Sequence, residues 1–147
     1  MRISTKGRYG LRILLDVALH QEQGPVALRD VSRRQAISHK YLWQVINPLK
    51  AAGFLHATRG AHGGYVLARK PEQITIRDIV GILEGPVSVV ACVTAPGTCA
   101  RSASCTAREA WTEIENKLNA AMSGITLRDL VQRHKERESL GGPAYVI

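Results

Sequence analysis

The sequence of 147 residues predicts a mainly α-helical protein with one small β-hairpin. Two short runs of alternating residues, 54–58 and 65–68, flank a glycine-rich segment, which is typical of a hairpin. A long amphipathic stretch, 106–122, predicts a helix of roughly 25 Å at 1.5 Å per residue. Shorter stretches also repeat apolar residues at helical spacing, the first of them at Leu11, Leu14, Leu15, Ala18 and Leu19.

The N-terminal part predicts a support helix followed by a helix–turn–helix. The support helix covers residues 9–20, and a short second helix covers 28–34. A turn at 35–37 leads to Ser38, which is a good N-cap for a third helix. The buried stripe of that third helix consists of Tyr41, Leu42, Val45, Ile46 and Leu49.

A hairpin follows the third helix. Its strands are 54–58 and 65–68, and its tip is the basic, glycine-rich segment Arg59-Gly60-Ala61-His62-Gly63-Gly64. Glycine lets such a tip bend tightly and approach another backbone. A further helix is expected from Thr75 to about Glu84. This order of elements, a helix–turn–helix and then a hairpin or wing, predicts a winged helix-turn-helix.

The charged residues divide unevenly along the chain. Residues 1–70 carry twelve basic and three acidic side chains, a net charge of +9, whereas residues 71–147 carry eight and nine, a net charge of −1. A basic half joined to a neutral half is typical of a nucleic-acid-binding module with a separate sensor or partner module. We therefore expect the first half to bind double-stranded DNA.

The basic N-terminus does not predict a secretory signal or a membrane anchor. A secretory signal is excluded because Arg12 and Asp16 interrupt the apolar run that follows. A membrane-surface protein is disfavoured because the chain has no lipidation motif, and no stretch approaches the roughly 20 apolar residues of a membrane span. We expect a cytoplasmic protein without a membrane partner, in which thiols stay reduced.

The second helix of a helix–turn–helix enters the major groove with its N-terminal residues. We expect Ser38 and Lys40 to contact phosphate, although Ser38 can also serve as a cap alone, and His39 and Gln44 to read bases. Arg59 suits a narrow minor groove, where the negative potential is greatest. The predicted DNA-binding residues are Arg2, Ser38, His39, Lys40, Tyr41, Trp43, Gln44, Arg59, Gly60, His62 and Gly63.

The three cysteines, Cys92, Cys99 and Cys105, lie in one loop, 86–105. Thiols clustered in a cytosolic protein favour metal or redox chemistry over structural disulfides. Soft thiolates select iron–sulfur clusters or zinc, but zinc sites usually have closer cysteine pairs. An iron–sulfur cluster, of the 2Fe-2S or 4Fe-4S type, is the preferred interpretation, and the alternative is a regulator of the same fold without a cluster that responds to thiol redox state or to a small molecule.

The helix after this loop is expected to form a homodimer. Thr106 and Glu109 suggest a capping box at its start. Its apolar stripe is too long for a helix that only covers a small domain. The predicted dimer contacts are Trp111, Ile114 and Leu118.

Several motifs resemble the Rrf-type bacterial transcription regulators. They are the opening Met1–Tyr9, the pairs Ile37-Ser38 and Tyr41-Leu42, the wing Arg59–Tyr65, and the cysteine loop before a long helix. The resemblance covers nearly all of residues 1–135. It implies a dimer built on the long helix, a cluster held by Cys92, Cys99 and Cys105, and binding to a promoter palindrome as a regulator, in most cases a repressor.

The sequence departs from this family at the fourth cluster ligand. The iron–sulfur regulators of the family use a histidine three residues after the last cysteine, where this chain has Arg108. The nitric-oxide sensors use an aspartate of the partner's N-terminal region, where this chain has Arg8. Neither arginine can ligate iron, so Glu109, a serine or threonine of the loop, or a small exogenous ligand would have to complete a cluster site. A third departure is Trp43, where the iron–sulfur regulators have a glutamate that tunes DNA preference.

An enzyme is not expected, because a catalytic thiol protein would need a C-x-x-C pair or a cysteine–histidine couple. The glycine-rich tip also lacks the Gly-Lys-Ser/Thr ending of a phosphate-binding loop. The predicted organisation is a DNA-binding domain at 1–85, a sensor loop at 86–105, dimerisation and C-terminal helices at 106–138, and a flexible tail at 139–147.

Overall fold

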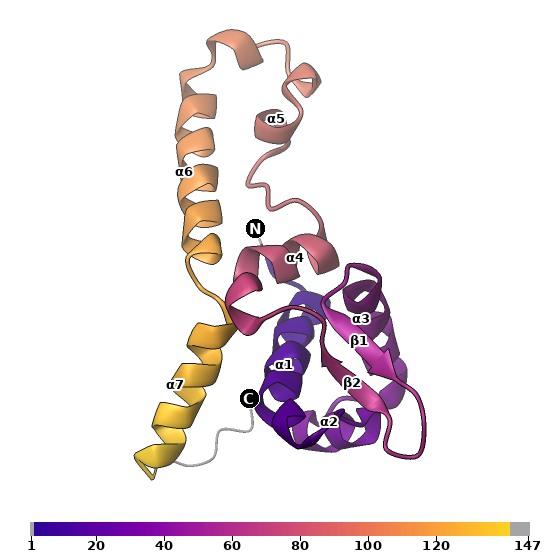
Figure 1. Cartoon of the computed structure of the whole chain (residues 1–147). Coiled ribbons are helices and arrows are strands. Elements are labelled where there is room, and N and C mark those ends of the chain that lie inside the picture. Colours follow the sequence, from indigo (N-terminus) through magenta and orange to yellow (C-terminus); the bar gives the residue numbers. More distant parts are fainter. Residues whose placement is uncertain (1, 142–147) are drawn as a thin grey trace.

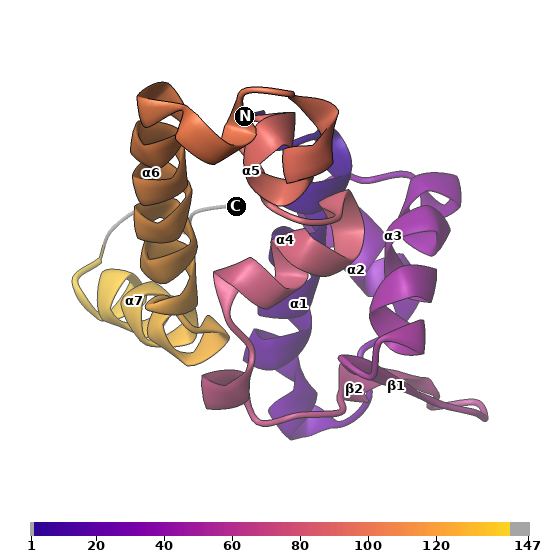
Figure 2. The ribbon, with the colours of Figure 1, turned by 90° about the horizontal axis from the view of Figure 1, so that it is seen from above.

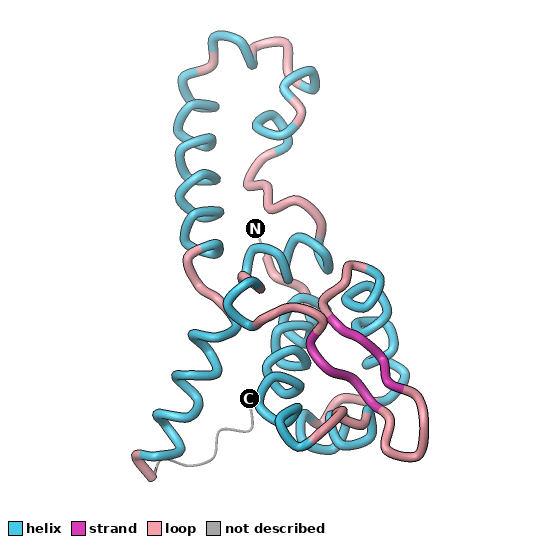
Figure 3. Tube along the Cα trace, viewed as in Figure 1, coloured by secondary structure: helices cyan, strands magenta, loops and turns pink. Residues whose placement is uncertain are grey.

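A computed structural model of the chain describes residues 2–141 and confirms the predicted fold class, helices with a two-stranded antiparallel hairpin (Figures 1 and 3). The elements in chain order are α1 (Thr5–His20), α2 (Leu28–Gln35), α3 (His39–Ala51), β1 (Leu55–Thr58), β2 (Gly64–Leu67), α4 (Ile76–Glu84), α5 (Ala91–Thr94), α6 (Thr106–Ser123) and α7 (Leu127–Ser139). Short 3-10 turns cover Gln21–Gln23, Pro71–Gln73, Pro96–Thr98 and Ser102–Ser104.

The core lies where α1 packs against α2, α3 and α4. The apolar stripes predicted for α1 and α3 face each other in this core. Burying each such side chain stabilises the folded state by about 1.5–3 kcal/mol. The fully buried side chains include Ile13, Leu14, Leu42, Val45, Ile46, Leu49, Phe54, Ile74 and Ile79.

Helix α1 begins at Thr5, one turn before the predicted start at residue 9. The side chain of Ser4 caps it by accepting the Lys6 backbone N–H at 3.1 Å. The carboxylate of Glu84, at the end of α4, accepts the Gly7 N–H at 2.8 Å. A carboxylate at a helix N-terminus satisfies an orphan donor and complements the helix dipole. The sequence did not reveal this contact because it joins residues far apart in the chain.

The hairpin pairs Leu55 with Leu67 and Thr58 with Gly64. Val26 extends it, since Val26 and Tyr65 exchange two backbone hydrogen bonds of 2.9 Å. A Cβ atom on Gly64 would lie 2.5 Å from the Val26 carbonyl carbon. Gly64 is therefore needed for the close approach that ties the hairpin to the helical body.

Helices α1 to α4 and the hairpin pack together as one body, and the C-terminal half extends away from this body and then returns to it. Helix α6 extends away from the body with α5 beside it, and α7 comes back to pack on α1 (Figure 1). The return is anchored where Leu127 N donates to Ile74 O at 2.8 Å and the Leu127 side chain is fully buried. Seen from above, α1 and α4 lie between α6 on one side and α3 on the other (Figure 2).

The C-terminal half departs from one prediction at the start of α6. The capping box expected at Thr106 is wrong, because Cys105 is the N-cap of α6 and no side chain caps this end. In the predicted tail, residues 142–147 lie outside the described part of the chain, and Ser139 is still helical. No helix within residues 2–141 is long and apolar enough to cross a membrane.

Candidate DNA-binding surface and cysteine segment

The start of α3 presents the side chains expected to meet DNA. Ser38 caps α3 by accepting the Tyr41 N–H at 3.3 Å. Trp43 is 45% exposed, although large aromatic side chains usually seek burial. The exposed positions on this surface are those of Ser38, His39, Lys40, Trp43 and Gln44. These residues form one solvent-facing surface of α3.

Tyr41 is placed differently from the other predicted contacts. It is half-buried, and its ring packs edge-on against Tyr9 with the ring centroids 5.5 Å apart. The Arg12 guanidinium lies 5.1 Å from the centre of the Tyr9 ring. Tyr41 therefore fixes α3 on α1, as its place in the apolar stripe indicated.

A buried ionic network holds α2 at a fixed angle to α1, and thereby positions α3. Asp16 is 2% exposed. Arg34 donates to both of its carboxylate oxygens, at 3.0 and 2.7 Å, and Gln35 Nε2 donates at 2.9 Å. The hydrogen bonds to Asp16 raise the pKa of the Arg34 guanidinium above its ordinary value. The only signal of this network in the sequence is an aspartate within an apolar helical stripe.

The hairpin tip carries the remaining predicted contacts of the wing. Arg59, Gly60 and His62 are exposed. Gly60 has φ +118°, a backbone conformation that L side chains rarely adopt. Gly63 N donates to Gly60 O at 3.0 Å, and a Cβ on Gly63 would lie 2.3 Å from the Thr58 carbonyl oxygen. The glycines thus shape a tight tip and leave the basic side chains exposed to a ligand.

Arg2 lies apart from the tip and from the start of α3. It lines a hollow with Ile3 and with Glu84–Ser88, where α4 leads into the cysteine segment. In Figure 1, the N-terminal end of the chain lies beside α4. The structure therefore does not bring Arg2 together with the exposed residues of α3.

The three cysteines occupy one segment, Ala91–Cys105, between α4 and α6. Cys92 lies on α5, Cys99 follows a 3-10 turn, and Cys105 precedes α6. All three are free thiols, and Cys99 is the most exposed. Within residues 2–141, no three His, Cys, Asp or Glu side chains are arranged to hold a metal ion. The structure thus gathers the cysteines on one segment but not around one point.

Arg108 closes the base of this segment. Its Nε donates to the Cys92 carbonyl oxygen at 2.8 Å, and one Nη donates to the Ser102 carbonyl oxygen at 3.5 Å. Arg108 thereby ties both ends of the segment to the first turn of α6.

Helix α6 leaves its apolar face uncovered. Within the described residues, α6 contains no buried side chain. Trp111 is 41% exposed and Ile114 is 46% exposed, while Leu118 is half-buried. Exposed apolar stripes of this kind are typical of protein–protein contact surfaces.

Comparison with known proteins identifies the family. A model described as "Rrf2: Iron-dependent Transcriptional regulator" matches residues 3–133. The protein rrf2 of Nitratidesulfovibrio vulgaris is 41% identical over 132 residues, covering 90% of this chain and 88% of that protein. CymR, the global cysteine regulator of B. subtilis, matches with TM-score 0.77 and 37% identity over 90% of this chain and 98% of its own. IscR of T. potens matches with TM-score 0.76 and 33% identity over 94% and 91%. The chain therefore belongs to the Rrf2 family of winged-helix, DNA-binding transcriptional regulators, whose members are not enzymes.

Proposed function

We propose that this regulator is a cytoplasmic homodimer that represses transcription from a palindromic promoter site, and that the state of its three cysteines controls DNA binding. The observation that carries the proposal is the arrangement of three parts in one chain. An exposed recognition helix and basic hairpin lie on the body, an uncovered apolar helix extends from it, and the cysteine segment joins the two.

Each half-site of the palindrome receives one recognition helix. His39 and Gln44 read base edges in the major groove, and Ser38 and Lys40 contact phosphates. Trp43 lies beside them and contributes an apolar contact, while Arg59, with Gly60, His62 and Gly63, follows the adjacent minor groove. Arg2 contacts DNA outside this surface, and Tyr41 acts by holding α3 in place.

The dimer forms through α6, with Trp111, Ile114 and Leu118 at its centre. These side chains are exposed or half-buried in one chain, and they become buried when two copies of α6 pack together. A few residues near the centre of an interface, tryptophan prominent among them, provide most of its binding energy. The dimer sets the spacing of the two α3 helices to the spacing of the half-sites.

The first candidate for cysteine control is an iron–sulfur cluster. Thiolates are the usual ligands of such clusters, so the donor set of Cys92, Cys99 and Cys105 fits in kind. The cluster would supply a centre that oxidation, nitric oxide or iron shortage can alter. Protein residues would couple the state of the cysteines to DNA binding. Arg108 links the closed cysteine segment to α6, and α6 carries the dimer contacts.

The second candidate is a thiol switch without a cluster, and one observation favours it. Arg108, in the position of the fourth ligand, already binds the Cys92 carbonyl oxygen, and the sulfur atoms are not gathered around one point. Oxidation by peroxide would join two of the thiols in a disulfide, with water as the by-product. Either switch acts on the same segment.

One experiment separates these candidates. The protein is purified without oxygen, its iron and sulfide are counted, and ultraviolet–visible and Mössbauer spectra are recorded. A cluster predicts iron, sulfide and visible absorption that Cys92→Ala, Cys99→Ala and Cys105→Ala each abolish, whereas Arg101→Ala, at an exposed position of the same segment, does not. Protein that holds no iron, cannot be reconstituted, and loses DNA affinity with peroxide supports the thiol switch. If neither iron nor peroxide changes DNA affinity, cysteine control is wrong.

DNA binding itself is tested by its salt dependence. Six or more phosphate contacts per dimer predict that affinity falls by roughly 10³-fold or more between 50 and 200 mM salt. Fluorescence anisotropy with labelled promoter duplexes measures this slope. Affinity that does not depend on salt would contradict the proposed use of the basic surface.

A further inference from the structure

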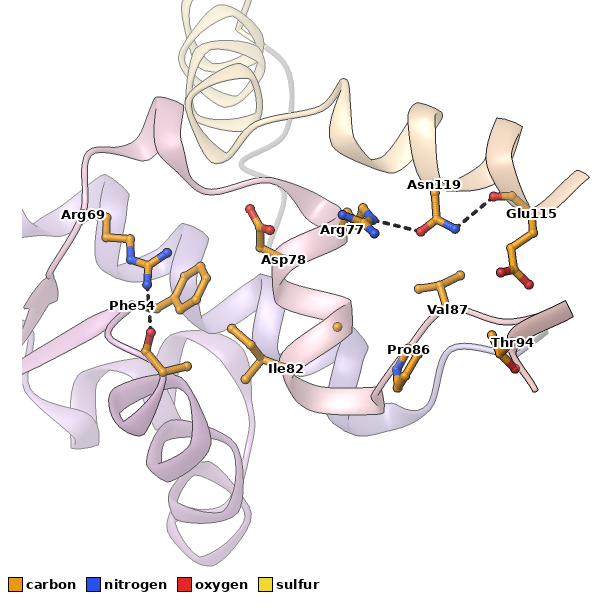
Figure 4. A pocket seen from close by; sticks show the side chains of 12 residues that line it. Phe54, Arg69, Arg77, Asp78, Ile82, Pro86, Val87, Thr94, Glu115 and Asn119 are labelled. Carbon is orange, nitrogen blue, oxygen red and sulfur yellow. Dashed lines mark hydrogen bonds between the residues drawn. The ribbon is translucent and has the colours of Figure 1, made fainter. Parts of the chain in front are cut away.

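A pocket of about 580 Å³ lies where the body, the cysteine segment and α6 meet (Figure 4). Volumes of about 300–1,000 Å³ are usual for small-molecule sites, which occur preferentially between structural units. Its wall combines the residues that follow α3, helix α4, the link from α4 to α5, and α6. A molecule bound there would contact α4, the residues that follow the recognition helix α3, and α6 at the same time.

One side of the pocket is polar. Figure 4 shows Arg77, Asn119 and Glu115 in a row along it. Arg77 Nε donates to Asn119 Oδ1 at 2.9 Å, which leaves both Nη groups without a partner among the described residues. Glu115 Oε2 accepts the Val89 N–H at 3.1 Å, and its Oε1 has no partner in the described chain. A guanidinium and a carboxylate therefore lie on one wall with unused hydrogen-bonding capacity.

The rest of the lining is more apolar. Ile82, Pro86 and Val87 line it, and the Phe54 ring lies deeper, with the Arg69 guanidinium 4.5 Å from its centre. Asp78 also lines the pocket, and its Oδ2 atom already accepts the backbone N–H and the hydroxyl of Thr75. Gly81 forms part of the wall, and a Cβ built on Gly81 would meet no atom within 4 Å. The space beside α4 is therefore open, and a glycine keeps it so at some cost in helix propensity.

From this combination of groups, we propose that the pocket binds an apolar α-amino acid as an effector. The ligand carboxylate pairs with the two Nη groups of Arg77, a geometry that arginine favours. The ligand ammonium pairs with the Glu115 carboxylate, and the apolar side chain packs on Ile82, Pro86 and Val87. A plain carboxylic acid fits less well, because it would face Glu115 without a counter-charge.

The bound amino acid would bridge α4 and α6, since Arg77 belongs to α4 and Glu115 to α6. Helix α4 packs on both α1 and α3. A ligand that fixes α6 relative to α4 therefore alters the distance between the recognition helices of a dimer. This effector site is separate from cysteine control. Only its effect on promoter affinity rests on the proposed function, the binding of a dimer to DNA.

Isothermal titration calorimetry of the full chain without DNA tests the site directly. L-leucine is the first probe, with L-valine, L-methionine and L-phenylalanine beside it. 4-Methylpentanoate and 3-methylbutylamine lack one charged group each. Gly81→Leu fills the open space, and Gly81→Ala is the matched control, because both favour the helix but only leucine reaches into the pocket. Arg77→Gln should weaken binding by at least about tenfold, through loss of a charged hydrogen bond.

The expected result is binding of at least one amino acid by wild type and Gly81→Ala and none by Gly81→Leu. At ten times Kd the ligand should raise Tm by roughly 3–6 °C and change operator affinity by about fivefold or more. No binding of any probe, or equal binding by Gly81→Leu, overturns the site. Equal binding of the acid or the amine overturns the amino-acid assignment. Binding without any change in the affinity of a DNA-competent protein overturns the effector role alone.

Discussion

Single residues decide how firmly the recognition helix is held. Asp16 is the clearest case, because a buried carboxylate costs several kcal/mol unless it is paired and hydrogen-bonded. Here Arg34 and Gln35 satisfy it from α2, so one side chain of α1 fixes the orientation of the whole helix–turn–helix. The sequence showed an aspartate within an apolar stripe, but its partners depend on how α2 packs, which periodicity does not encode.

Asp16→Ala is expected to lower the free energy of unfolding by about 3 kcal/mol, because it leaves the Arg34 guanidinium unpaired beside the core. Urea denaturation followed by circular dichroism measures the change. Asp30→Ala is the matched control, since Asp30 pairs with Arg33, which is 76% exposed, and such surface pairs contribute about 1 kcal/mol or less. Equal effects of the two substitutions would show that the buried network does not stabilise the fold.

Arg108 has a role that its place in the sequence does not show. The sequence marked it as unable to ligate iron, whereas in the structure it binds the Cys92 and Ser102 carbonyl oxygens. Arg108→Ala is expected to speed amide hydrogen exchange in residues 92–104 by about tenfold or more, through loss of charged hydrogen bonds. Arg101→Ala, an exposed arginine of the same segment, should leave it unchanged. Unchanged exchange in Arg108→Ala would exclude a closing role.

Helix starts show what local sequence can and cannot predict. Thr75 and Thr126 begin α4 and α7 with complete capping boxes, each reciprocated by the aspartate three residues later. Thr106 and Glu109 have the same spacing, but Cys105 adopts the extended N-cap conformation and its carbonyl oxygen accepts the Arg108 N–H at 3.0 Å. The N-cap is therefore Cys105, one residue before Thr106. Glu109 lies four residues after this N-cap rather than three, so it is not at the position from which its side chain could accept the N-cap backbone N–H.

The capping box of α7 should make stability depend on pH. Thr126 donates its backbone N–H and its hydroxyl to Asp129, and these hydrogen bonds hold the pKa of that carboxyl below 3.8. The ionised Asp129 carboxylate adds to the free energy of unfolding. This stabilisation is fully present above about pH 3.8 and disappears as the pH falls through the lower pKa of the native state. Asp129→Asn should therefore unfold at lower urea concentration than wild type at pH 7, with the difference shrinking below pH 3.8. Glu136→Gln serves as an exposed control, and a pH-independent difference would contradict the assignment.

Across the whole molecule, the sequence predicted the architecture better than the site. The order of helices and hairpin followed from periodicity and glycine placement, and the solvent-facing positions of His39 and Gln44 followed from the stripe on the other side of α3. The pocket beside Arg77 could not be predicted, because α4, α6 and the residues after α3 build it from distant parts of the chain. The arrangement of the three thiols also depends on segment closure, which their spacing alone does not fix.

The proposed dimerisation would link these parts, and the uncovered face of α6 is where it can be tested. Trp111 and Ile114 are more than two-fifths exposed in one chain, so a charge placed at Ile114 costs little in the monomer but would be buried without a partner in the dimer. Ile114→Glu is therefore expected to sediment as a monomer in analytical ultracentrifugation while keeping the helical circular dichroism spectrum of wild type. Its affinity for a palindromic duplex should fall on the order of 10²-fold, because two linked recognition helices no longer bind together.

The matched control for this prediction is Asn116→Glu, which adds the same charge at an exposed position on the opposite face of α6. This variant should remain dimeric and bind the palindrome as wild type does. Affinity for a single half-site should be similar in all three proteins, since the recognition helix and the hairpin are untouched. If Ile114→Glu stays dimeric with unchanged affinity, the two chains must meet through a surface other than the apolar face of α6.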